Sequence, residues 1–387
     1  MKRGPLHLGY CTNVHPGEGL DALDGILSEV VSVKERVSPQ ASFGTGLRLG
    51  NEAVTSLISE PNALAALADR FRAEDLYVFT ANGFPYGDFS ADAVKEAVYT
   101  PSWLDPRRAE YTRNLAEVIA ALPGPPQRTI STVAGGFLPD TDSPEAEADM
   151  ARALVETAEF LRRLAERSGV SIRLCLEPEP WTTLETINDA IRFFHQGLFP
   201  AGDVVDDHLG LCLDCCHQAL FYESPKESLK MLRASGIPLG KVQVSSALHL
   251  AHPEDPEAKK ALFRFDEPRY LHQVSGFSPV GVLSALDLPD LRTPPDDWLL
   301  AESWRCHFHV PIWWDGDGAH LTTTRSDWEE VVKAVMEHAQ CAHFEIETYT
   351  WDVIPKDQKQ ALAGGELVNS IALEFSALEM LLEGMGY

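Results

Sequence analysis

The sequence has little positive charge for its length. Its 387 residues include 32 Lys and Arg against 58 Asp and Glu, a formal net charge of −26. A surface with this excess of acid repels phosphate backbones and anionic lipids. We therefore expect a small-molecule partner and no nucleic acid.

The sequence also lacks long hydrophobic runs and a paired cysteine framework. No uninterrupted apolar stretch reaches the roughly 20 residues that a membrane helix needs, and residues 1–10 lack the apolar core of a signal peptide. The seven cysteines are an odd number spread over a long chain, which is not typical of a secreted disulfide scaffold. These absences predict a cytoplasmic protein without membrane insertion. They do not specify an oligomeric state.

Short β-type runs alternate with longer segments of helical period about eight times. The predicted strands lie at 8–12, 42–47, 76–80, 128–133, 172–177, 209–214, 241–245 and 343–347. Alternation of this kind indicates an α/β fold with parallel strands and helices packed outside them. No glycine-rich phosphate loop follows the first strand, so we favour a (β/α)₈ TIM barrel over an open doubly wound sheet.

Polar residues cluster where the predicted strands end, which is where barrel enzymes build their sites. They are Asn13, His15, Arg48, Asn82, Glu177, Glu179, Asp214, His217 and Glu347. We expect these side chains to converge on the carboxyl face of the barrel.

The chain is longer than a minimal barrel, and the surplus follows the seventh strand. Residues 252–297 carry seven prolines and show no sustained period, so they predict an ordered loop or subdomain over the barrel mouth. Residues 304–311 alternate like an extra strand, from which we expect at most one of His307 and His309 to face the pocket, His309 being preferred. We predict one TIM-barrel domain over 1–387 with an insertion at 252–311.

Three carboxylates end neighbouring strands: Glu177 the fifth, Asp214 the sixth and Glu347 the eighth. Held close together in a partly dry cavity they would repel strongly, and a shared divalent cation relieves this. Oxygen ligands favour Mg or Mn, or a borderline ion such as Zn or Co. On the seventh strand, the two-residue period of a strand places the side chain of Gln243 on the face where it can be the fourth ligand. His249 and His309 are competitors for that position.

Simpler interpretations of these residues stay open. A carboxylate at a strand end can pair with an arginine, and Gln243 can merely hydrogen-bond a neighbour. Cys212 and Cys215 have C-x-x-C spacing, but no second pair exists, so we expect buried thiols there and at Cys216 and no structural zinc.

The strand ends resemble those of the xylose isomerase-like TIM barrels. The matching motifs are LEP at 176–178, LDCCHQ at 213–218, VQV at 242–244 and IET at 346–348. Within that group, the hydroxypyruvate isomerase type holds its metal with Glu, Asp, Gln and Glu in this order, which implies Glu177, Asp214, Gln243 and Glu347.

Four longer segments are similar to the EboE family of metabolite traffic proteins: GYCTNVHPGE at 9–18, NGFPYGDF at 82–89, RFDEPRYLH at 264–272 and HFHVP at 307–311. That resemblance implies a role in moving a small metabolite out of the cytoplasm.

Together these features predict a metal-dependent, sugar isomerase- or epimerase-like protein that acts on a small polyol or hydroxycarbonyl metabolite. Glu177 and Glu347 would exchange a proton with the substrate as base and acid. Five further residues would bind the substrate: Asn13, Asn82, Glu179, His217 and His309. One alternative is a non-catalytic carrier that uses the same cavity. A second is an endonuclease-IV-like phosphodiesterase, which needs a basic surface and a histidine-rich trinuclear site, and the charge of −26 opposes it.

Overall fold

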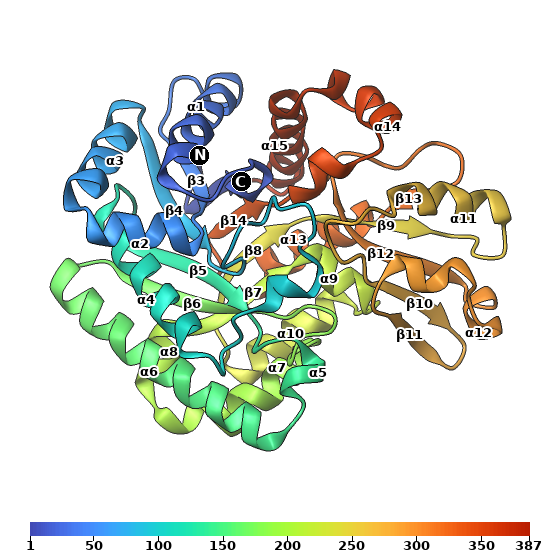
Figure 1. Ribbon diagram of the computed structural model, residues 1–387, viewed down its shortest axis with the longest axis horizontal. Helices are drawn as coiled ribbons and strands as arrows, with labels where there is room; N and C mark the ends of the chain where they lie inside the picture. The colour runs from blue at the N-terminus through green and yellow to red at the C-terminus, as the bar shows by residue number, and fades with distance from the viewer.

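Eight parallel strands build the barrel in the computed structural model, which describes residues 1–387 (Figure 1). They are β2 (Leu6–Tyr10), β3 (Phe43–Arg48), β4 (Leu76–Asn82), β5 (Gln127–Val133), β6 (Ser171–Glu177), β7 (Leu209–Asp214), β8 (Leu239–Val244) and β14 (His343–Ile346). A short strand, β1 (Lys2–Arg3), pairs antiparallel with β2. The predicted α/β barrel is therefore confirmed, and each of the eight predicted strands is present.

The barrel is nearly closed. The sheet order is β1-β2-β14-β8-β7-β6-β5-β4-β3, and a single parallel bridge between Cys11 and Gly46 joins β2 to β3. Gly46 is required there, because a Cβ atom at this position would collide with the carboxylate of Glu345. Glu345 in turn receives a hydrogen bond from Lys241, so the barrel interior contains a fully buried ion pair.

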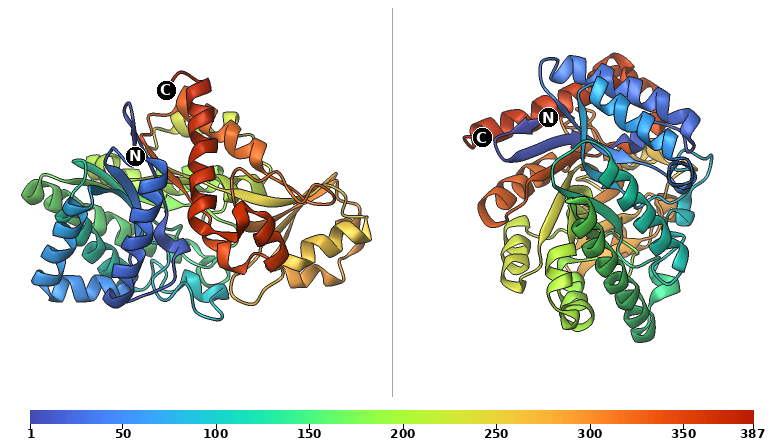
Figure 2. Two further views of the ribbon diagram at one scale, coloured as in Figure 1. Left: turned by 90° about the horizontal axis from the view of Figure 1, so that it is seen from above. Right: turned by 90° about the vertical axis from the view of Figure 1, so that its left-hand side faces the viewer.

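Helices cover the outside of the barrel (Figures 1 and 2). The longer ones are α1 (Leu20–Val37), α2 (Asn51–Ser59), α3 (Pro61–Ala73), α4 (Pro106–Ala121), α6 (Pro144–Ser168), α10 (Pro225–Ser235), α13 (Arg325–His338) and α15 (Leu367–Gly384). The shorter ones are α5 (Leu138–Thr141), α7 (Ile187–Phe193), α8 (Asp203–His208), α9 (Cys215–Leu220), α11 (Pro256–Leu262), α12 (Asp296–Leu299) and α14 (Lys356–Ala361). None of the helices is both long and apolar enough to cross a membrane.

Helix α6 shows how sequence sets these elements. The side chain of Ser143 accepts a hydrogen bond from the backbone N–H of Ala146, Pro144 occupies the first turn, and Gly169 ends the helix with a φ of 73°. Apolar residues at steps of three and four along the helix are buried as a row: Met150, Leu154, Ala158, Leu161 and Leu164. This face packs the helix against the barrel.

A second, antiparallel sheet follows β8 and lies beside the barrel at the right of Figure 1. Its strands are β9 (Ser246–Leu250), β10 (Val274–Ser278), β11 (Gly281–Ala285), β12 (Ser303–Val310) and β13 (Thr322–Thr323), in the order β11-β10-β12-β9-β13. β12 is the extra strand that the alternation at 304–311 predicts. Val274, Trp304 and Phe308 belong to the same hydrophobic core as the barrel residues, so the second sheet is packed onto the barrel.

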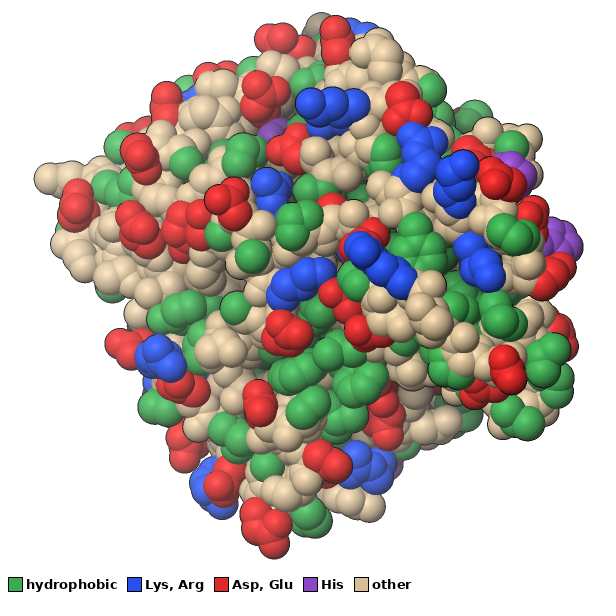
Figure 3. All heavy atoms as spheres, turned by 45° about the vertical axis from the view of Figure 1, so that its right-hand side comes forward, with side chains coloured by type: hydrophobic (Ala, Val, Ile, Leu, Met, Phe, Trp, Pro, Cys, Tyr) green, Lys and Arg blue, Asp and Glu red, His purple; other side chains and the backbone are tan.

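Charged side chains are dispersed on the face shown in Figure 3. Asp and Glu side chains alternate with Lys and Arg over this face and do not form one large patch. This view contains no continuous basic surface.

Candidate metal centre

Three acidic side chains meet at the carboxyl end of the barrel. Glu177 ends β6, Asp214 ends β7, and Glu347 follows β14 directly. One oxygen atom from each lies within 4.8 Å of the other two, and all three residues are buried. None of the three forms an ion pair with lysine or arginine, and the basic side chains beside them are His217 and His309, at 3.8 to 4.0 Å.

Amide groups hold the carboxylate of Glu347. Asn13 and Asn82 both donate to its Oε1 atom, at 2.7 and 2.8 Å, and Gln243 donates to Oε2 at 2.6 Å. Three N–H donors on two oxygens favour the ionised form of a carboxyl group. Asn13 and Asn82 therefore contact the predicted site through Glu347, and they also line the cavity beside it.

Both polar atoms of the Gln243 side-chain amide form hydrogen bonds. Its Nε2 atom donates to Glu347, while its Oε1 atom accepts a hydrogen bond from the Cys212 thiol at 2.6 Å. In this orientation Gln243 supports Glu347, and its oxygen would reach a cation only after the amide turned over. The ligand assignment of Gln243 stays a prediction.

Two buried carboxylate oxygens at this site have no partner. Asp214 Oδ1 accepts from the Ser245 hydroxyl at 2.8 Å and from the backbone N–H of His217 at 2.9 Å, but Oδ2 accepts nothing. Glu177 Oε2 is likewise buried without a hydrogen bond. Buried carboxylate oxygens need a donor, a proton or a cation. The residues present therefore fit a divalent metal.

The pKa shifts of the three carboxyl groups also favour a bound cation. Burial raises the pKa of Glu177 to about 8, with His217 opposing the shift and Asp214 adding to it. Burial and the charges of Glu177 and Asp214 raise the pKa of Glu347 well above its usual value. Burial also acts on Asp214, but the nearby His217 and His309 outweigh it and lower the pKa of that group. This buried environment disfavours ionisation of all three carboxyl groups at the same time unless a cation is bound.

Three histidines form a second cluster beside the carboxylates. His217 lies on α9, and His307 and His309 lie on β12. The Nε2 atom of His307 lies 3.2 Å from Nε2 of His217 and 3.1 Å from Nε2 of His309. The expectation that at most one of His307 and His309 faces the pocket is wrong, because residues two apart on a strand share a face.

The cavity at the barrel mouth is small, about 50 Å³. The predicted residues that line it are Asn13, Asn82, Glu177, Glu179, His217, His309 and Glu347, and the second-sheet region adds Tyr270, Leu271, Gln273 and His307. Asp214 and Gln243 lie behind this lining. A larger hollow of about 690 Å³ lies at the opposite end of the barrel, around the first residues of β5 and β6, away from the acidic and histidine clusters.

Three residues expected at the mouth have other partners. His15 contacts the hydroxyl of Tyr10, Arg48 pairs with Glu18, and His249 contacts Thr322. None of the three lines the cavity. His249 is therefore not brought to the carboxylates, and the expectation that all the polar strand-end residues converge does not hold for His15 and Arg48.

Sequence reasoning missed the polar residues that support the mouth from outside the barrel strands. Gln273 donates to the Tyr99 hydroxyl at 2.7 Å, and that hydroxyl donates to Glu179 Oε1 at 3.1 Å. Burial raises the pKa of Glu179 to about 7. Both Tyr99 and Gln273 lie outside the strand ends where sites are sought, so no strand-end pattern marks them.

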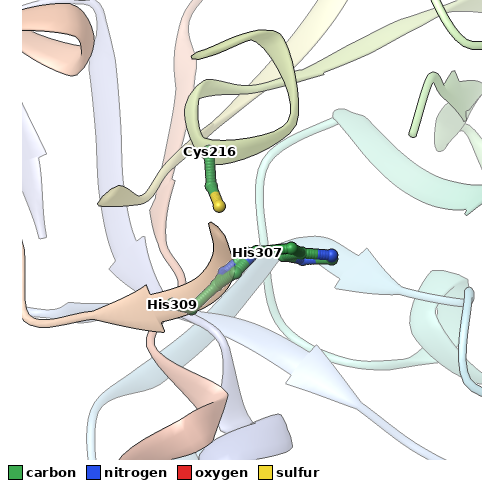
Figure 4. A group of neighbouring side chains, drawn as sticks. All are labelled: Cys216, His307 and His309. Carbon is green, nitrogen blue, oxygen red and sulfur yellow. Dashed lines mark hydrogen bonds between the residues drawn. The ribbon is translucent and has the colours of Figure 1, made fainter. Parts of the chain in front are cut away.

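The seven cysteines are all free and buried, as expected for Cys212, Cys215 and Cys216. In Figure 4 the sulfur of Cys216 points from α9 toward β12, the strand that carries His307 and His309. One potential ligand atom from each of these three residues lies within 4.8 Å of the others. Burial raises the pKa of the Cys216 thiol well above its usual value, which favours the protonated form.

No protein-family model and no curated protein sequence matches the chain. Solved structures do resemble it. A D-tagatose 3-epimerase-like protein aligns at 14% identity with a TM-score of 0.50, covering 98% of this chain and 97% of its own. A xylose isomerase-like TIM barrel protein from Mycobacterium smegmatis, in complex with magnesium, aligns at 11% identity with a TM-score of 0.53, covering 97% of this chain and 96% of its own. A candidate sugar phosphate isomerase/epimerase from Anabaena variabilis aligns at 13% identity with a TM-score of 0.51, covering 98% and 99%. The chain has the fold of the xylose isomerase-like TIM barrels.

Proposed function

We propose that the protein is a metal-dependent isomerase or epimerase acting on a small polyol or hydroxycarbonyl metabolite. One observation carries this proposal: Glu177, Asp214 and Glu347 are buried together without a lysine or arginine partner, and two of their oxygens have no hydrogen bond. Glu177, Asp214 and Glu347 would hold one divalent ion of the Mg, Mn, Zn or Co class. Gln243 would be the fourth ligand after its amide turned over.

A bound divalent ion would polarise a substrate carbonyl and make the neighbouring carbon more acidic. Glu177 and Glu347 would then remove and return a proton on that carbon. Of the two, Glu177 is better placed to accept it, because its Oε2 atom is unpaired whereas Glu347 is fixed by three amides. The remaining cavity groups would orient the substrate through hydrogen bonds to its hydroxyls: Asn13, Asn82, Glu179, His217 and His309.

We also propose a wider role, which the resemblance and the charge support. Similarity to the EboE family supports a cytoplasmic step in metabolite trafficking or export, and the net charge of −26 supports a small molecule over nucleic acid. We also propose that residues 252–311 cover the mouth of a single-domain barrel, because Tyr270, Gln273 and His309 line the cavity.

A carrier that holds a metabolite in the same cavity without turnover is the second candidate. The two functions differ in one measurable respect. An isomerase exchanges a carbon-bound proton with solvent, and a carrier does not.

The test is deuterium wash-in from heavy water into a panel of small ketoses, with the protein saturated in Mn²⁺. We expect exchange at the carbon next to the carbonyl in the wild type, and a fall of roughly 10² to 10⁴ fold in Glu177→Gln, which keeps an oxygen ligand and loses the base. Tight ketose binding without exchange above the buffer rate would refute the isomerase and favour the carrier. Exchange that persisted in Glu177→Gln and failed in Glu347→Gln would move the base to Glu347.

A further inference from the structure

We propose that His217, His307 and His309 hold a second metal ion beside the carboxylate site, and that this ion is of the nitrogen-preferring class typified by Zn²⁺. The proposal rests on the ring nitrogens of the three histidines and is independent of the isomerase proposal.

Hydrogen bonds determine which nitrogen of His307 carries its proton. Gln273 Nε2 faces only acceptors, the Tyr99 hydroxyl, Glu179 and the carbonyl of Pro180, so the amide orientation is fixed. Its oxygen therefore lies toward His307, 2.6 Å from Nδ1. Nδ1 must donate to that oxygen, which leaves Nε2 of a neutral His307 as a lone pair, with the Tyr349 hydroxyl 3.4 Å from it.

His309 is constrained in the same way by a different group. Its Nδ1 atom lies 3.0 Å from the backbone carbonyl oxygen of Glu347, and a carbonyl oxygen only accepts. Nε2 of a neutral His309 is therefore also a lone pair. It lies 3.1 Å from Nε2 of His307, so two lone pairs face each other at hydrogen-bond distance with no hydrogen between them.

His217 cannot resolve this conflict alone. A hydrogen on its Nε2 atom would serve the 3.2 Å contact with His307 but not the contact between His307 and His309. The other ring nitrogen of His217, Nδ1, is buried and has no hydrogen-bond partner. A proton on either nitrogen of His217 therefore leaves the contact between His307 and His309 without a bridging hydrogen.

The spacing of the nitrogens suits a shared cation. Imidazole nitrogens bound to tetrahedral zinc at about 2.0–2.1 Å lie about 3.3 Å from one another, close to the 3.2 and 3.1 Å that separate His307 Nε2 from the Nε2 atoms of His217 and His309. The Nδ1 atoms of His307 and His309 already donate to Gln273 and to the Glu347 carbonyl, the arrangement that orients metal-binding histidines. Three imidazole donors select Zn-like ions over Mg²⁺.

Asp214 connects the two sites. Its Oδ1 atom lies 3.8 Å from Nε2 of His217 and 4.0 Å from Nε2 of His309, and Asp214 also belongs to the carboxylate group with Glu177 and Glu347. One carboxylate can therefore contact both ions. Cys216 Sγ and Glu179 are further candidates for the fourth position of the histidine site.

The histidine site also joins two parts of the fold. His217 lies on α9, directly after barrel strand β7, whereas His307 and His309 lie on β12 of the second sheet. An ion bound by all three would fasten the second sheet to the barrel mouth. Loss of that ion should therefore loosen the sheet as well as change the metal content.

The test is metal content and zinc X-ray absorption of the full chain loaded with Mn²⁺ and then with limiting Zn²⁺. We expect zinc at one per chain, with an absorption spectrum dominated by imidazole nitrogen. His307→Ala should lose that zinc while keeping manganese, and the exposed His320→Ala should keep both. Gln273→Leu leaves all three histidines in place, covers the case in which His307→Ala does not fold, and should weaken zinc binding about 10 to 100 fold.

Two outcomes would overturn the proposal: zinc with only oxygen scatterers, or unchanged zinc binding in both His307→Ala and Gln273→Leu. Glu177→Gln separates the two sites, because it should lower manganese binding and spare the zinc. If zinc with nitrogen ligands remains in that variant while deuterium exchange is absent even from the wild type, the histidine site stands and the isomerase proposal fails.

Discussion

Lys241 Nζ donates a hydrogen bond to Glu345 Oε2 inside the barrel, where neither side chain is exposed. Lys241 lies on β8, two positions before Gln243. Glu345 lies on the neighbouring strand β14, two positions before Glu347. The ammonium group of Lys241 is therefore paired with Glu345, deeper in the barrel than the carboxylates of the candidate centre. The charge of Lys241 acts on Glu177 and Glu347, but the side chain pairs with neither.

Replacing this lysine should be costly. Lys241→Met leaves Glu345 buried and unpaired, so the free energy of unfolding should fall by about 3–5 kcal/mol. The measurement is urea unfolding followed by circular dichroism. The double variant Lys241→Met with Glu345→Leu should recover most of the loss, because no buried charge remains.

Lys260→Met is the matched control, since the Lys260 side chain is 76% exposed and its partner Glu257 lies at the surface. It should change the unfolding free energy by less than about 0.5 kcal/mol. A Lys241→Met protein as stable as this control would show that the buried pair contributes nothing.

The barrel strands could be predicted because buried parallel strands are near-continuous apolar runs. The carboxylates could be predicted because each follows such a run directly, as Glu177 and Asp214 do. The role of Gln243 could not be predicted, since its amide orientation depends on Cys212 and Glu347, which approach it only in the folded barrel. Nor could the positions of Arg48 and His15, because their partners Glu18 and Tyr10 turn them away from the mouth.

The prediction for the histidine pair on β12 is wrong for a different reason. The alternation at 304–311 correctly predicts a strand, but residues two apart share a face, so His307 and His309 enter the cavity together. What the sequence does not contain is the docking of that strand against α9, which brings His217 to them. Contacts between an insertion and the barrel depend on the path of the whole insertion.

Metal binding should be visible in thermal stability. An ion that binds only the folded state stabilises it by about 2.7 kcal/mol at a free concentration of 100 Kd. We expect Mn²⁺ to raise the melting temperature of the apo protein and a chelator to reverse the rise. Asp214→Asn removes a negatively charged ligand and should respond little to Mn²⁺. A full Mn²⁺ response in this variant would contradict the assignment of Asp214 as a ligand.

The amides that hold Glu347 should tune metal affinity. The side-chain N–H of Asn13 donates to Glu347, while its oxygen has no hydrogen-bond partner. Asn13→Ala therefore removes one support of the carboxylate without breaking another bond, and Mn²⁺ affinity should fall about 10 to 100 fold. Titration calorimetry measures this. Asn62→Ala, on the exposed face of α3, should bind Mn²⁺ as the wild type does.

The covering segment should close more tightly on a filled site. The backbone N–H groups of Val94 and Lys95 donate to the carbonyl of Arg269, and Lys95 also pairs with Asp287, so a barrel loop and the insertion meet over the mouth. Mn²⁺, Zn²⁺ and a bound ketose should slow trypsin cleavage after the exposed Lys260. Equal cleavage rates with and without these ligands would argue against a lid.

The stability of the fold should also depend on pH through Glu374, a buried carboxyl group on α15. Its Oε1 atom accepts hydrogen bonds from the backbone N–H of Ile312, at 3.2 Å, and from the hydroxyl of Thr348. Burial raises the pKa of Glu374 to about 7. The unfolded value is near 4.3, so between these two values the folded state binds more protons than the unfolded state.

The sign of the effect follows from this difference in bound protons. Stability from Glu374 is fully present below about pH 4 and falls as the pH rises toward 7, with a total loss of about 4 kcal/mol. Glu374→Gln cannot ionise, so its unfolding free energy should exceed that of the wild type at pH 8 and approach it at pH 5. Glu330→Gln, on the exposed side of α13, is the control and should follow the wild-type curve. Parallel pH curves for the wild type and Glu374→Gln would mean that Glu374 is ionised in the folded protein at both pH values, with Thr348 and Ile312 stabilising the carboxylate.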